Sequence, residues 1–199
     1  MIKKLIKIIT KEEFEKLFEA ATKLEANAKR QSRKDKIRAY RVAMLLGFEA
    51  GMRISEIVGY KGMSKGKNNK GEIIVAEVNI PPLSKPNIGT ASIKIMGKGS
   101  KERMVPRPKR LNSKAVAMLP LKIKRRALQG FITELALKEL KKHISFHTLR
   151  HGFGSHLANV ADRPLHEIQM LMGHTRISTT GIYLHANPKK ALEGAREAF

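Results

Sequence analysis

The sequence of 199 residues contains no cysteine and no tryptophan, and it has only 17 acidic residues against 40 lysine and arginine residues. Without cysteine, neither a disulfide nor a cysteine-ligated zinc site can form. There is no run of about 18 apolar residues, so no segment is expected to span a membrane. The opening MIKKLIKIIT has an apolar part that is too short, and too broken by Lys7, for a secretory signal. We therefore expect a cytoplasmic protein.

The excess of basic residues gives a formal net charge of +23. Such an excess opposes compaction through mutual repulsion and usually serves to meet a polyanion. Nucleic acid is the favoured partner. A basic surface that serves solubility, or contact with a ribosome or a membrane, is the alternative.

The first half of the chain predicts two long helices. Thr10 followed by Glu13 is a capping box, and the apolar residues after it recur at helical spacing. A nearly continuous apolar pattern over residues 37–50 predicts a buried helix that ends at Gly51. The basic segment 29–36 reads as a solvated link, and the Lys, Gly and Asn residues of 61–72 read as an exposed loop.

Strand patterns occupy residues 73–80 and 91–96, with a returning strand over 102–105. The remaining periodicity predicts helices over 121–142, 146–159, 163–172, 177–185 and 188–197. The predicted fold class is therefore mainly α with one small antiparallel β-sheet, an α+β fold. We expect residues 1–199 to form a single domain.

All seven histidines lie between His143 and His185. Metal binding is one explanation, because His147 and His151 share a helix face, but Arg150 lies beside them and would repel a cation. Packing of each histidine in its own hydrogen bonds is a second. The third is a phosphate site, because an arginine fork and an imidazole three residues apart suit two phosphate oxygens. Tyr183, nine residues after His174, would then supply a nucleophile.

Four segments, in this order, resemble the signature boxes of the tyrosine recombinases, or phage-type integrases. They are GMRISEI (51–57), MGKGSKERMVP (96–106), HTLRHGFGSHL (147–157) and LMGHTRISTTGIYLH (171–185). The resemblance covers nearly the whole chain and implies the catalytic-domain fold of that family. The family usually carries an N-terminal domain that clamps DNA. The residues before Thr10 are too few for one, so we expect a catalytic domain without it.

The resemblance assigns catalytic roles to six residues. They are Arg53, Lys98, His147, Arg150, His174 and Tyr183. Tyr183 would attack a DNA phosphate, the two arginines and His174 would hold its oxygens, His147 would accept the tyrosine proton, and Lys98 would protonate the departing 5′-oxygen. Lys101 is a rival for the lysine role, and Glu56 matches an acidic residue that supports the site. No metal ion or other cofactor is implied.

The other histidines and tyrosines receive structural interpretations. His151, His156 and His185 are expected to support or pack around the site, and His143 and His166 to lie on the surface. Tyr40 and Tyr60 are expected in the core.

The resemblance implies a site-specific recombinase that cleaves and rejoins double-stranded DNA at specific recombination sites through a 3′-phosphotyrosyl intermediate. It would act as a homo-tetramer on DNA, with no membrane partner, and the segment 187–199 would pack either in cis or on a neighbouring subunit. Long basic loops favour the integration of a mobile element. The resolution of chromosome dimers is the main alternative, and a DNA-binding module without catalysis or a type IB-like topoisomerase are two others.

Overall fold

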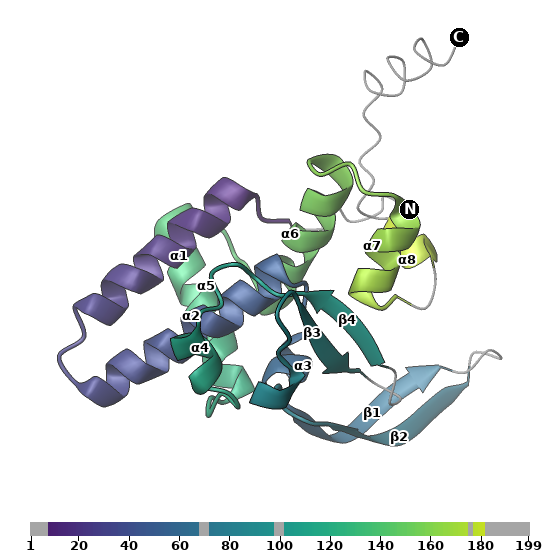
Figure 1. Ribbon diagram of the computed structural model, residues 1–199, viewed down its shortest axis with the longest axis horizontal. Coiled ribbons are helices and arrows are strands. Elements are labelled where there is room, and N and C mark those ends of the chain that lie inside the picture. Colours follow the sequence, from purple (N-terminus) through teal and green to yellow (C-terminus); the bar gives the residue numbers. More distant parts are fainter. Residues whose placement is uncertain (1–7, 68–71, 98–101, 175–176, 182–199) are drawn as a thin grey trace, which may run out of the picture.

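The computed structural model describes residues 8–67, 72–97, 102–174 and 177–181. Figure 1 shows helices α1, α2, α4 and α5 at one end of the molecule, two β-ribbons below the centre, and α7 with α8 at the other end. Helix α6 runs between the two ends. The mainly α architecture with small antiparallel ribbons confirms the predicted fold class.

Helix α1 (Lys11–Ala26) begins at the predicted capping box. The Thr10 hydroxyl accepts from the Glu13 amide at 3.2 Å, and the Glu13 carboxylate accepts from the Thr10 amide at the same distance. Phe14 is fully buried and stacks on Phe48 of α2, with ring centroids 4.1 Å apart. The apolar face of α1 therefore packs on α2.

Helix α2 (Gln31–Glu49) begins six residues earlier than predicted. The polar segment read as a link forms its first turns, where the Gln31 amide donates to Asp35 at 2.9 Å and Arg38 pairs with Asp35. The middle of α2 is buried and packs on α6. Gly47 makes this approach possible, because a Cβ atom there would lie 2.7 Å from the Phe146 ring.

The strands form two separate ribbons in the described part of the chain. Strand β1 (Tyr60–Lys67) pairs antiparallel with β2 (Ile73–Ile80), and β3 (Ser92–Met96) pairs antiparallel with β4 (Glu102–Pro106). The prediction of an exposed loop over 61–72 was wrong for residues 61–67. Their glycines and lysines still pair through the backbone with the apolar strand β2.

The second half of the chain is helical. Its helices are α4 (Ser113–Ala117), α5 (Arg125–Leu140), α6 (Phe146–Asn159), α7 (Leu165–Met172) and α8 (Ile177–Gly181). The bounds of α6 agree with the prediction, whereas α4 was not predicted. The predicted helix over 188–197 lies outside the described residues. Among the described helices, none is both long and apolar enough to cross a membrane.

Candidate active site

A tight reversal between α2 and α3 (Ile54–Val58) positions Arg53. Helix α2 ends at Glu49, and Gly51 then adopts a left-handed conformation with φ of +61°. A Cβ atom on Gly51 would lie 2.4 Å from the Phe153 ring of α6, so only glycine fits this turn. Arg53 follows as the N-cap residue of α3, with 35% of its side chain exposed.

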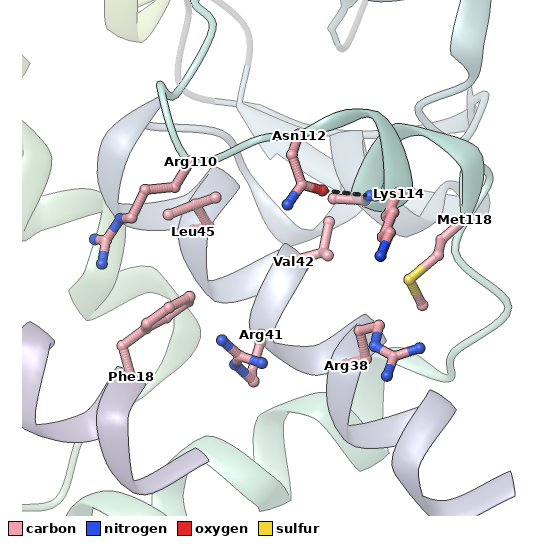
Figure 2. A pocket seen from close by; sticks show the side chains of 10 residues that line it. Phe18, Arg38, Arg41, Val42, Leu45, Arg110, Asn112, Lys114 and Met118 are labelled. Atoms are coloured by element: carbon pink, nitrogen blue, oxygen red, sulfur yellow. Dashed lines mark hydrogen bonds between the residues drawn. The ribbon is translucent and has the colours of Figure 1, made fainter. Parts of the chain in front are cut away.

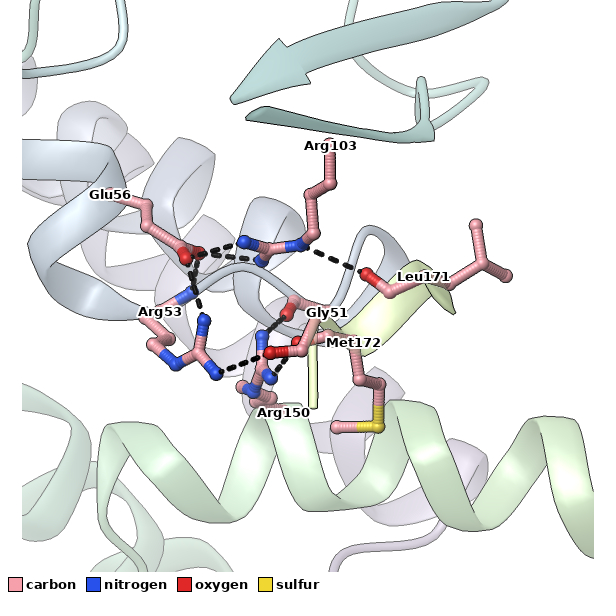
Figure 3. A network of polar contacts seen from close by, with 8 residues as sticks. Gly51, Arg53, Glu56, Arg103, Arg150, Leu171 and Met172 are labelled. Carbon is pink, nitrogen blue, oxygen red and sulfur yellow. Dashed lines mark hydrogen bonds and ion pairs between the residues drawn. The ribbon is translucent and has the colours of Figure 1, made fainter. Parts of the chain in front are cut away.

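A buried carboxylate holds two arginines in place. The Glu56 side chain is 1% exposed. It accepts from the Arg53 backbone amide at 2.6 Å and from Arg53 Nη1 at 2.9 Å. It also accepts a bidentate pair from Arg103 of β4, at 2.6 and 2.8 Å. Burial alone would raise the pKa of Glu56, but the guanidinium groups of Arg103 and Arg53 outweigh it and hold the pKa below its ordinary value. Figure 3 shows Glu56 between the two guanidinium groups.

Arg150 projects from α6 into the interior and is 1% exposed. Its Nη1 donates to the Gly51 carbonyl and its Nη2 donates to the Met172 carbonyl (Figure 3). One guanidinium thus connects the end of α2 to the end of α7, two segments far apart in the sequence.

The turn after α7 brings His174 to the same place. Gly173 ends α7 with φ of +59°, and its carbonyl accepts from Arg53 Nη2 at 3.3 Å. His174 Nδ1 lies 3.0 Å from the hydroxyl of Thr180, which is fully buried in α8. Burial first, and then the charges of Arg150 and Arg53, lower the pKa of His174 to about 4.

His147 and His151 stand one turn apart on α6, with ring centroids 4.4 Å apart and rings nearly perpendicular. Partial burial, and then the charges of Arg150 and Arg53, lower the pKa of His147, although part of the residue is exposed. The pKa of His151 is lowered to about 4 by burial, His147 and Arg150. Both rings are therefore neutral at pH 7.

A cleft of about 650 Å³ opens beside these groups. Its lining includes Arg53, His147, and the exposed Arg125 and Arg126 at the start of α5. Arg53 and Arg103 share one carboxylate, that of Glu56, so one negative charge opposes two positive charges in these contacts. Such a cleft suits a phosphate.

The structure brings together four of the six residues predicted as catalytic: Arg53, His147, Arg150 and His174. Lys98, its rival Lys101 and Tyr183 lie outside the described residues, as does His185. No group of three or more His, Cys, Asp or Glu side chains in the described segments is placed to hold a metal ion.

Of the residues predicted to have structural roles, some lie where the sequence placed them and one does not. His143 and His166 are exposed and Tyr40 is buried, as predicted. Tyr60 is only half-buried, with Arg125 above its ring, so its placement in the core was wrong.

Sequence reasoning missed Arg103, which anchors Glu56 and also donates from Nε to the Leu171 carbonyl at 3.0 Å. A signal was available. Arg103 alternates with Val105, which is buried, so the strand pattern places both on the inward face. The sequence reading also passed over Arg125 and Arg126.

Comparison with known proteins finds similarity to one family and to several of its named members. Residues 7–190 match the model of the phage integrase family. The chain is 29% identical to tyrosine recombinase XerC of Stutzerimonas stutzeri over 162 residues, which are 72% of this chain and 47% of that protein. It is 29% identical to tyrosine recombinase XerD of Staphylococcus aureus over 178 residues, 77% of this chain and 52% of that protein. The chain thus spans about half the length of these curated relatives.

Two solved structures share the fold. The XerH site-specific recombinase in a pre-cleavage complex with its difH substrate superposes with a TM-score of 0.64 at 20% identity, covering 98% of this chain and 55% of that chain. The catalytic domain of bacteriophage HP1 integrase superposes with a TM-score of 0.54 at 16% identity, covering 94% of both chains.

Proposed function

Because the chain belongs to the phage integrase family, we propose that it carries the catalytic domain of a site-specific DNA recombinase that breaks and rejoins strands through a tyrosyl phosphodiester. The observation that carries the proposal is the convergence of Arg53, Arg150, His147 and His174 from three separate parts of the chain. Guanidinium groups gathered in this way stabilise charge that develops on a phosphate during displacement, and neutral imidazoles add hydrogen-bonding groups.

In this mechanism, Arg53 holds a non-bridging oxygen of the scissile phosphate at the mouth of the cleft. Glu56 fixes its guanidinium, so little reorganisation is needed when DNA arrives. Arg150 is buried, and its contact with the phosphate requires the segment carrying Met172 and Gly173 to shift when DNA binds. His174, oriented by Thr180, donates a further hydrogen bond.

The proton transfers balance without a metal ion or ATP. Tyr183 attacks phosphorus and its phenol proton passes to His147, whose lowered pKa keeps the ring neutral and able to accept it. The bond from phosphorus to the 5′-oxygen breaks, and Lys98 protonates that oxygen. The products are a 3′-phosphotyrosyl ester and a free 5′-hydroxyl. Attack by another 5′-hydroxyl reverses the step and joins new strands.

The proposed partner is double-stranded DNA with specific recombination sites, bound by a homo-tetramer in the cytoplasm. The large excess of positive charge supports the DNA partner. The relatives named as recombinases and integrases support the same class of reaction. Integration of a mobile element is the favoured biological role, and dimer resolution uses the same chemistry.

A suicide substrate tests the proposal. A nicked duplex that releases a short fragment after cleavage traps the covalent adduct, and a library of such duplexes presents candidate sites. We expect the unaltered chain to form a protein–DNA adduct that survives denaturation and Tyr183→Phe to form none. An adduct of equal yield with Tyr183→Phe would refute the assigned nucleophile, and DNA binding without any adduct would favour a non-catalytic binding module.

The products then separate the biological roles. Recombinants between two different sites indicate integration, and recombinants between two copies of one site indicate resolution. Relaxation of supercoils without recombinants would instead indicate a topoisomerase.

A further inference from the structure

A second basic hollow lies away from the catalytic cluster, between α1, α2 and α4. Its volume is about 330 Å³. Figure 2 shows Arg110, Asn112 and Lys114 on one side of the hollow, with Arg38 and Arg41 across from them. Among the described residues that line it, none is acidic. In Figure 1 these three helices stand at the opposite end of the molecule from α7, which contributes to the candidate active site.

The arginines of the hollow are held in fixed positions by groups behind them. Glu25 accepts from Arg38 Nε at 2.8 Å and from Arg41 Nη1 at 2.6 Å. The Arg41 and Arg110 guanidinium carbons lie 4.8 and 4.6 Å from the centre of the Phe18 ring. An anion entering the hollow would therefore meet donors that are already ordered, which reduces the entropic cost of binding.

Donor capacity remains after these contacts. Lys114 is exposed and makes no ion pair within the described segments. Asn112 uses its side-chain oxygen to cap α4, accepting from the Ala115 amide at 2.9 Å, and this leaves its NH₂ as a donor.

A purely structural role is the competing explanation, because Arg110 also binds Glu15 and Glu49 and so joins α1 to α2. Four cations line the hollow, and four carboxylates contact three of these cations, so the charges balance overall. The carboxylates are absent from the described lining, however, so the surface that faces the hollow is cationic. The ion pairs of the described segments also leave out Lys114, which a structural network would not need.

We propose that this hollow is a second phosphate-binding site, separate from the catalytic cluster. Guanidinium, ammonium and amide donors around one small space match the several acceptor oxygens of a phosphate. The phosphate can come from a free polyphosphate, or from the DNA backbone outside the cleavage site. The hollow would bind the phosphate oxygens of either source through the same donors, and this binding does not depend on the proposed cleavage reaction.

Pyrophosphate binding to the whole chain, measured by calorimetry, provides the first arm of the test. Lys114→Gln removes the charge of an exposed residue without disturbing an ion pair in the described structure. Lys138→Gln, on an exposed part of α5, is the matched control. We expect Lys114→Gln to weaken pyrophosphate binding about tenfold, the loss typical of one hydrogen bond between charged groups, and the control to leave it unchanged.

Arg41→Lys supplies a second variant, because it keeps the charge and removes the planar guanidinium with its fixed fork of donors. It should also weaken pyrophosphate binding, and its melting temperature without ligand shows whether the fold is intact. If it does not fold, Lys114→Gln decides the question.

The second arm measures DNA affinity against salt concentration. If the phosphate belongs to DNA, Lys114→Gln lowers the slope of log K against log salt by about 0.9, the value for one phosphate contact. If it belongs to a free ligand, pyrophosphate binding falls and the slope does not change. Either result supports the site. Equal pyrophosphate affinity and equal slope in Lys114→Gln and Lys138→Gln would overturn it, whether or not the chain cleaves DNA.

Discussion

Replacement of Glu56 by glutamine should destabilise the fold strongly. The change removes one negative charge and almost no volume, and leaves Arg53 and Arg103 with an amide in place of a carboxylate that accepts four hydrogen bonds. Breaking a buried ion pair from one side costs about 3–5 kcal/mol. Arg53 is 35% exposed and can recover hydration, whereas Arg103 is 9% exposed and cannot. We therefore expect a loss of about 3 kcal/mol in the free energy of unfolding.

Urea unfolding at pH 7 measures this loss directly, and a thermal melt should fall by roughly 6–12 °C for a chain of this size. Glu134→Gln, on the exposed face of α5, is the matched control and should change the free energy of unfolding by less than about 0.5 kcal/mol. A value for Glu56→Gln within that same range would refute the reasoning, because it would mean that the buried carboxylate contributes nothing.

The dependence of the free energy of unfolding on pH provides a second test of the contacts of Glu56. The pKa of Glu56 in the folded protein lies below its ordinary value of 4.5, so its contribution to stability is present above pH 4.5 and is lost as the pH falls through the lowered pKa. Glutamine does not titrate. The difference in stability between the unaltered chain and Glu56→Gln should therefore shrink below pH 4.5.

Three further predictions concern the backbone, His174 and pH. Gly51→Ala should lower the free energy of unfolding by more than about 1 kcal/mol, because φ at this position is positive and the alanine Cβ would meet the Phe153 ring. Gly130→Ala, in an open helical position, should raise the free energy of unfolding by about 0.5–1 kcal/mol, and urea unfolding compares the two variants. Thr180→Val should slow adduct formation on a suicide substrate by up to about tenfold through loss of the contact to His174, and Thr180→Ser should restore the rate. The pKa values of His151 and His174 fall from 6.5 to about 4 on folding, so stability should be complete above pH 6.5 and decline toward pH 4, with a shallower decline in His151→Gln.

The sequence predicted well those elements whose caps and apolar spacing lie within the element or directly beside it. Helix α6 is bounded correctly because Ser145 caps it, accepting from the Thr148 amide at 3.3 Å, and because its apolar residues recur at helical spacing. Strand β1 was missed because its pairing partner, and not its own composition, holds it in place. The start of α2 was missed because bonds between polar side chains, such as Gln31 to Asp35, support turns that have no apolar face.

The candidate site likewise contains residues that the sequence could predict and contacts that it could not. Residues in recognisable boxes, such as Arg53 and Arg150, could be assigned from the sequence. Their supporting contacts could not, because the carbonyls that Arg150 binds belong to the ends of two other helices. Arg103 was missed because a single arginine among lysines and a glutamate looks like a surface residue until the partner strand and Glu56 are in place.

The two contacts of Arg150 also constrain how this protein can evolve. In a lineage that no longer required the proposed DNA cleavage, loss of Arg150 would still remove the link between the end of α2 and the end of α7 and would lower the abundance of the folded protein. Arg53 is open to solvent and carries a smaller share of that linkage. A folded descendant that has become inactive should therefore retain Arg150 and show its first losses at Arg53.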